Sequence, residues 1–185
     1  MDCAPTVRRK VVLLSSAHSV SGELALHNER LSDLLNDPRS SEVVLHDAAV
    51  TRLLAPARPL AQHPTAVVTK SHIVLAFEFE DKDAPATRRF FSYVAKSTFP
   101  VFMILHGMEV RGSLHTLGNL DLRALVASHD LRFLAVTNAA VSLIANERYL
   151  IRQNAVLVNA LQIRYIAAAS PETPEEPPAP AAATG

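Results

Sequence analysis

The residues best suited to metal binding or acid–base chemistry are eight histidines, but their spacing matches no known ligand motif. There is no His-x-x-x-His or Cys-x-x-Cys spacing among His18, His27, His46, His63, His72, His106, His115 and His129. Histidine often occupies half-buried surface positions without a functional role. The sequence therefore predicts no metal site, and an enzyme that uses His106 or His115 between two halves of the chain is a third hypothesis only.

Residues that could act as nucleophiles or as a carboxylate pair are equally scattered. The chain has no Gly-x-Ser-x-Gly motif and no glycine-rich phosphate loop, and its single cysteine, Cys3, lies near the N-terminus without a fixed partner. Glu78 and Glu80 would share one face of a strand, but Asp81 and Asp83 follow them, which is typical of a solvated strand end. We therefore predict no catalytic residue and no cofactor, and we expect that the protein is not an enzyme.

Two short groups of basic residues are the remaining candidates for binding chemistry. The first consists of Arg8, Arg9 and Lys10, and the second of Arg88 and Arg89. If the fold brought these groups together, they would form an anion-binding patch, and RNA would be a candidate ligand. Such small groups usually just keep a surface soluble, and aromatic residues make up only 5% of the chain, so few bases could stack on them. RNA binding is therefore the alternative hypothesis.

The composition predicts a soluble globular protein without a strong charge preference. Of the 185 residues, 49% are hydrophobic and 19% are charged, and 18 basic residues balance 18 acidic ones. The first ten residues contain no apolar stretch that could act as a signal peptide. The longest apolar runs, such as residues 101–105, are far shorter than the roughly 20 residues that cross a bilayer. We expect a cytoplasmic location and no membrane partner.

An internal repeat predicts the elements that would position these residues. Adding 90 to the residue number, or 91 in the middle of the repeat, aligns the following pairs: Val11 with Val101, Val20 with Val110, Gly22 with Gly112, Leu24 with Leu114, Asp47 with Asn138, Val68 with Val158, and Ile73 with Ile163. No histidine of one copy is matched by a histidine in the other. The repeat therefore indicates a duplicated core and excludes a duplicated metal site.

Each copy is predicted to contain five short strands and one helix. In the first copy the apolar run 11–14 and the alternating segment 20–26 indicate a strand pair. Asn28, and Asn119 in the second copy, would cap a short helix with leucines on one face. Segments 43–45 and 50–54 would form two short strands or one bent strand. After a loop with three prolines, segments 66–69 and 73–79 would form a closing hairpin.

Four residues are singled out as structural repeat positions. Gly22 and Gly112 would allow a bent strand to approach another backbone closely, as small barrels require. Asp47 and Asn138 would form turns, because short polar side chains tolerate unusual dihedral angles. These positions predict shape and carry no information about a ligand.

The repeat divides the chain into five parts. These are an N-terminal arm at residues 1–9, the first copy at 10–80, a linker at 81–99, the second copy at 100–169 and a tail at 170–185. Asp83 and Pro85 are suited to the first turn of a helix in the linker. The tail has five prolines and no large apolar side chain, so we expect it to be disordered.

The spacing of the apolar residues and glycines resembles one known family. The second copy reads Ile104-x-x-Gly107-x-x-Val110-x-Gly112-x-Leu114, and the first copy keeps this spacing with Ala17 in place of the first glycine. This pattern resembles the first half of the motif of the Sm-like proteins, which are small RNA-binding β-barrels that assemble into rings. The resemblance implies a small β-barrel in each copy.

The polar residues depart from that family. Sm-like proteins hold RNA with an aspartate and an asparagine after the second strand and with an arginine–glycine pair in the last hairpin. The corresponding hairpin residues here are Thr69-Lys70 and Asn159-Ala160, so no RNA-binding residue carries over. The series Gly-x-Leu, RLSDLLN and DAAV also resembles a bacterial domain family with which no activity is associated.

The predicted fold is therefore mainly β with short helices (α+β), arranged as two tandem small β-barrel-like units joined by a helical linker. A repeated core without repeated polar chemistry favours a non-enzymatic protein-interaction or scaffold protein. Unpaired edge strands could drive homo-oligomerisation. The identity of any protein partner is not encoded in these residues.

Overall fold

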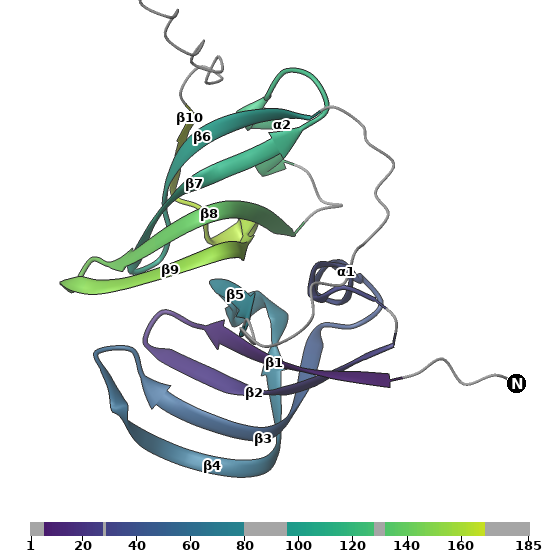
Figure 1. The fold of residues 1–185 in the computed structure, drawn as a ribbon, viewed down its shortest axis with the longest axis vertical. Coiled ribbons are helices and arrows are strands. Elements are labelled where there is room, and N and C mark those ends of the chain that lie inside the picture. Colours follow the sequence, from purple (N-terminus) through teal and green to yellow (C-terminus); the bar gives the residue numbers. More distant parts are fainter. Residues whose placement is uncertain (1–5, 28, 80–95, 128–131, 169–185) are drawn as a thin grey trace, which may run out of the picture.

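The fold is mainly β, as predicted, and its two halves have the same order of elements (Figure 1). The computed structural model describes residues 6–27, 29–79, 96–127 and 132–168. The first copy contains β1 (Thr6–Leu14), β2 (His18–His27), α1 (Leu31–Asn36), β3 (Glu42–Arg52), β4 (Ala55–Thr69), the 3-10 turn η1 (Lys70–His72) and β5 (Leu75–Glu78). The second copy contains β6 (Ser97–Ile104), β7 (Met108–Thr116), α2 (Leu122–Ala127), β8 (Phe133–Leu143), β9 (Asn146–Asn159), η2 (Ala160–Gln162) and β10 (Tyr165–Ala168).

The described strands form one antiparallel sheet in the order β10-β6-β7-β8-β9-β5-β1-β2-β3-β4. This arrangement differs from the predicted two tandem small β-barrel-like units, because β5 of the first copy pairs with β9 of the second copy as well as with β1, which joins both copies into one sheet. The predicted closing hairpin is wrong for a related reason. β4 pairs with β3, and the chain is redirected at η1 so that β5 reaches β1. The sheet therefore has two outer strands, β4 and β10.

The repeat glycines lie where neighbouring strands approach closely. Gly22 and Gly112 stand at irregularities in the β2–β3 and β7–β8 ladders. A Cβ atom at Gly22 would lie 2.8 Å from the carbonyl oxygen of His46, and one at Gly112 would lie 2.7 Å from that of Thr137. Both contacts are with backbone atoms, which cannot rotate away as a flexible side chain can. Any larger residue at either glycine would therefore have to displace the adjacent strand.

The two other repeat positions bend the strands that face these glycines. Asp47 in β3 has φ +48°, and Asn138 in β8 has φ +50°. Aspartate and asparagine tolerate this left-handed conformation better than most residues, because their short side chains can bond to nearby backbone. The segment around Asp47 is consequently one bent strand rather than two short ones.

Several predicted boundaries need correction. Helix α1 begins after Arg30, which is its N-cap in place of the predicted Asn28, and Asn28 itself lies outside the described residues. In α2 the carboxylate of Asp121 accepts from two backbone N–H groups of the first turn, so Asp121 is the cap in place of the predicted Asn119. β6 begins at Ser97, inside the predicted linker 81–99. The rest of that linker up to residue 95, the start of the N-terminal arm and the tail at 170–185 lie outside the described residues.

The three prolines predicted to lie in a loop are part of β4. Proline lacks an N–H group and is therefore confined largely to outer strands, which is where β4 lies.

Each hydrophobic core cluster contains residues from both copies. The first copy's core includes Phe133 and Leu157 from the second copy. The second copy's core includes Val74, Leu75 and Phe77 from the first copy. Since apolar burial is the main favourable contribution to folding, each half depends on the other for part of its stability.

Candidate functional site

The junction between the two copies is a short strand pair with a defined register. Leu75 and Ala76 of β5 lie opposite Val158 and Leu157 of β9. Beyond the pair, the backbone N–H of Asn159 donates to the carbonyl oxygen of Val74 over 3.0 Å. Backbone hydrogen bonds therefore join β5, the last strand of the first copy, to β9, the strand at the edge of the second copy.

The side chain of Asn159 is the polar centre of this junction. It is buried, and its Nδ2 donates to the carbonyl oxygens of Ile73 at 2.8 Å and Lys70 at 3.3 Å. Its Oδ1 accepts from the backbone N–H of Leu161 at 3.0 Å, which fixes the orientation of the amide. Nearby, Nε2 of Gln162 donates to the carbonyl oxygen of Ser71 at 3.0 Å. The second copy thereby satisfies three carbonyl groups of the first.

A second polar contact connects α1 to β8. Nδ2 of Asn36 donates to the carbonyl oxygen of Phe133 at 3.0 Å, and the backbone N–H of Phe133 donates to Oδ1 of Asn36 at 2.8 Å. One side chain thus replaces a strand partner for both backbone groups of Phe133. Figure 1 shows α1 on the side of the first copy that faces the second copy.

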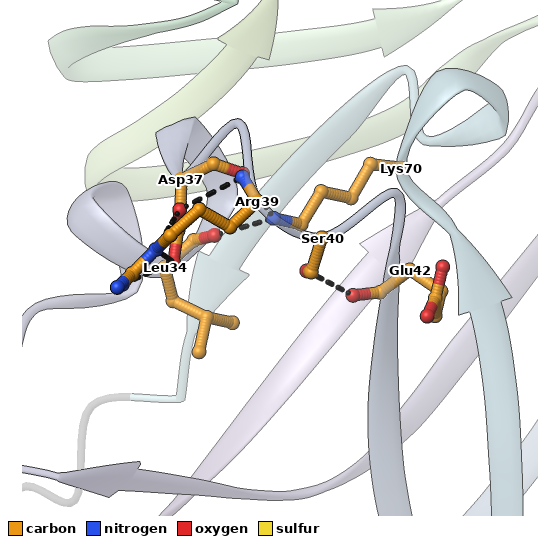
Figure 2. Close-up of polar contacts among 6 residues, drawn as sticks. All are labelled: Leu34, Asp37, Arg39, Ser40, Glu42 and Lys70. Atoms are coloured by element: carbon orange, nitrogen blue, oxygen red, sulfur yellow. Dashed lines mark hydrogen bonds and ion pairs between the residues drawn. The ribbon is translucent and has the colours of Figure 1, made fainter.

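Lys70 fastens α1 to the end of β4 from within the first copy (Figure 2). Its Nζ donates to the carbonyl oxygens of Leu34 at 2.7 Å and Asp37 at 3.0 Å, at the C-terminal end of the helix, where a positive charge is favourable. Burial lowers the pKa of Lys70, although the carboxylate of Asp37 favours its charged form. Asp37 also binds Arg39, and the hydrogen bonds from Arg39 lower the pKa of Asp37 to about 2.

The outer strands β4 and β10 are the counterparts of the strands that meet at the junction. Val67 of β4 matches Leu157 of β9, and Tyr165 of β10 matches Leu75 of β5 when 90 is added to the lower number. Leu157 is 8% exposed and Val67 is 66% exposed, while Leu75 is 0% exposed and Tyr165 is 51% exposed. Equivalent apolar residues are therefore buried where the strands meet and open where they do not.

The predicted basic residues do not form a free cationic patch among the described residues. Arg8 forms an ion pair with Glu23 at 3.4 Å on the neighbouring strand. Lys10 lies on the same strand face as Arg8, and Arg9 points to the opposite face and is half-buried. Arg88 and Arg89 lie outside the described residues.

The histidines proposed for an enzyme site lie apart from each other. His106 is in the β6–β7 turn, where its Nδ1 accepts from Arg164 at 2.7 Å. His115 lies at the other end of that hairpin between the hydroxyl groups of Thr98 and Thr137. Within the part of the chain that the structure describes, no group of three His, Cys, Asp or Glu side chains could hold a metal. No helix of that part is long and apolar enough to span a membrane.

Comparisons with protein-family models, with curated proteins and with solved structures found no match to this chain. The candidate site therefore depends on its geometry alone. Sequence reasoning gave no role to Asn36 and Asn159, which bond between the copies, or to Lys70, which fastens α1 within the first copy. A signal was available for two of them, because the repeat matches Asn36 with Ala127 and Lys70 with Ala160, while Asn159 matches Thr69.

Proposed function

We propose that the protein is a non-enzymatic scaffold that self-associates by pairing β10 of one chain with β4 of the next. The observation that carries this proposal is the junction inside the chain, where the equivalent strands β5 and β9 pair and bury their apolar residues. An exposed strand edge is a template for pairing with another chain. The pairing of β5 with β9 inside the chain is the guide to the geometry of the proposed pairing of β10 with β4 between chains.

The internal register predicts the intermolecular one. Leu75 and Ala76 pair with Val158 and Leu157 in the junction. The same shift of 90 residues places Tyr165 and Ile166 of one chain opposite Val68 and Val67 of its neighbour. The tyrosine and Val67 would then become buried, as their counterparts are.

The composition of β4 supports a contact confined to its C-terminal end. Pro56, Pro59 and Pro64 interrupt its earlier part, where proline removes backbone donors and discourages pairing. The last five residues, 65–69, contain no proline. This restriction favours one register over sliding along the long outer strand.

Some polar contacts of the junction would have counterparts in the proposed contact between chains. Thr69 takes the place of Asn159 and could donate to carbonyl groups near η2, while His72 takes the place of Gln162. Ala127 takes the place of Asn36, so the contact with β8 would have no counterpart. Fewer polar contacts, together with the entropy cost of association, should make this contact weaker and reversible.

Such a contact is heterologous, because the two surfaces that meet are different. Repetition then produces a closed ring if the rotation between chains closes and an open filament if it does not. A scaffold built in this way would present several copies of each surface of the protein.

Size-exclusion chromatography with light scattering tests self-association. We expect a concentration-dependent mass above the 20.1 kDa of one chain. Val67→Lys should raise the dissociation constant at least about tenfold, because pairing would bury an unpaired charge. Leu117→Lys is the matched control, since Leu117 is 67% exposed and lies outside both outer strands. A chain that remains a monomer at millimolar concentration would refute the proposal.

Cysteine crosslinking tests the register. In a Cys3→Ser background, Val67→Cys and Ile166→Cys chains are mixed under mild oxidation, because directly paired strand residues are close enough for a disulfide. We expect dimers in the mixture and little dimer with either variant alone. Abundant dimer from Val67→Cys alone would instead indicate β4 pairing with β4 and would exclude the head-to-tail contact.

A further inference from the structure

A pocket of about 490 Å³ lies between the hairpin turns of the two copies. The β1–β2 and β3–β4 turns of the first copy form one side, and the β6–β7 and β8–β9 turns of the second copy form the other. Figure 1 shows the β1–β2, β3–β4 and β8–β9 turns together on the left. The walls are mainly apolar and include Ala17, Leu53, Leu54, Leu143, Ile144 and Ala145. The volume is in the range of small-molecule sites.

Two basic side chains lie together at this pocket. His18 of β2 and Arg52 of β3 both line it and are direct partners in the antiparallel ladder. Neither side chain has a hydrogen-bond or ion-pair partner among the described residues, and no described carboxylate lines the pocket. One anion placed between the two would accept hydrogen bonds from both side chains.

The basic pair occurs once in each chain, although the turns that carry it are repeated. The repeat matches His18 with Met108 and Arg52 with Leu143. Met108 and Leu143 are buried, whereas His18 and Arg52 are exposed. Both copies therefore contribute apolar wall to the pocket, and the first copy contributes the charge. Such a division separates an apolar region from a cationic rim within one pocket.

We infer that this pocket binds a linear aliphatic carboxylate. The aliphatic chain would lie against Leu53, Leu143 and Ile144, and the carboxylate would accept hydrogen bonds from the guanidinium of Arg52, which matches carboxylate geometry in a bidentate manner. His18 would add a second donor. This binding does not require self-association, since it uses residues of a single chain.

Isothermal titration of the full chain with sodium octanoate tests the inference. We expect one site per chain, with octanoate binding more tightly than octylammonium, which has the opposite charge, and more tightly than butyrate, which has a shorter chain. Equal binding of octylammonium would overturn the inference, because the pocket would then recognise only apolar surface. Equal binding of butyrate would overturn it too, because the site would then recognise only an anion. Absence of saturable octanoate binding would do the same.

Two variants separate the roles of charge and wall. Arg52→Leu, which introduces the residue found in the second copy, should weaken octanoate binding about tenfold and remove the preference over octylammonium. Ile144→Ser should weaken binding of both ligands, and Ile144 is exposed enough for the fold to tolerate the change. Arg123→Leu on α2 is the control for loss of one surface charge. Unchanged octanoate affinity in a folded Arg52→Leu chain, verified by circular dichroism, would exclude the proposed role of Arg52.

Discussion

Helices α1 and α2 have the same length and equivalent places in the two copies, but different surroundings. Leu31 and Leu35 of α1 are buried, and Asn36 and Lys70 tie that helix to β8 and to the end of β4. In α2 no residue is buried, and Val126, the counterpart of Leu35, is 40% exposed. β8 of the second copy lies against α1, whereas α2 is contacted by β10 of its own copy, among the residues that the structure describes. Burial therefore follows from the presence of a neighbouring copy rather than from residue type alone.

The largest effect on stability should come from truncating Leu35, the buried member of the equivalent pair Leu35 and Val126. Leu35→Ala should reduce the free energy of unfolding by about 3 kcal/mol, because it leaves a cavity in the core. Val126→Ala should change it by no more than about 0.5 kcal/mol in the monomer, because that side chain is already partly in water. Urea denaturation of both variants measures the difference. Equal losses would contradict the structural difference between the copies.

An intermediate effect is expected at the end of β9. Asn159→Ala should cost about 2 kcal/mol, because it removes a buried side chain that donates to the carbonyl oxygen of Ile73 and accepts from the N–H of Leu161. Thr69→Ala, at the equivalent exposed position of β4, should cost less than about 0.5 kcal/mol at low protein concentration. The same denaturation measurement at high concentration would sharpen the comparison. If chains associate through β4, the cost of Thr69→Ala should rise with concentration.

The smallest effect is a pH dependence limited to the first copy. The pKa of Asp37 is about 2 in the folded protein, below the ordinary value of 3.8. A carboxyl group with a lowered folded pKa contributes stability above its unfolded pKa and loses it as the pH falls through the folded pKa. Wild type should therefore lose slightly more stability than Asp37→Asn between pH 4 and pH 2. Arg39→Gln should show the same reduced dependence in urea titrations at the two pH values, and an unaltered dependence in both variants would contradict this role.

The repeat was a good guide to local structure. The apolar alternation around Val20 predicted β2, and the spacing of Leu31 and Leu35 predicted a helix with one buried face, because these periods depend only on neighbouring residues. The closing hairpin was predicted wrongly, because the local sequence does not specify which strand pairs with which. Proline residues in β4 were interpreted as a loop because a proline-rich outer strand and a loop have similar sequences.

The candidate site was much less accessible from the sequence. The buried state of Asn159 and Lys70 depends on groups far away along the chain, such as the carbonyl oxygens of Ile73 and Leu34. Polar residues in a strand end are ordinarily solvated, so their type alone predicts exposure. His18 and Arg52 are likewise 34 residues apart in number, and only the β2–β3 register places them opposite each other.

The sequence by itself determined the secondary-structure elements, their repetition and the positions where a glycine or a short polar residue is required. These features follow from side-chain periodicity and from local backbone preferences, which act within a few residues. Only the tertiary structure decided that both copies share one sheet, that β5 pairs with β9, and that β4 and β10 are the outer strands of the described sheet. Strand pairing is a choice among distant backbone groups that are chemically alike, so the packing of whole faces selects the partner.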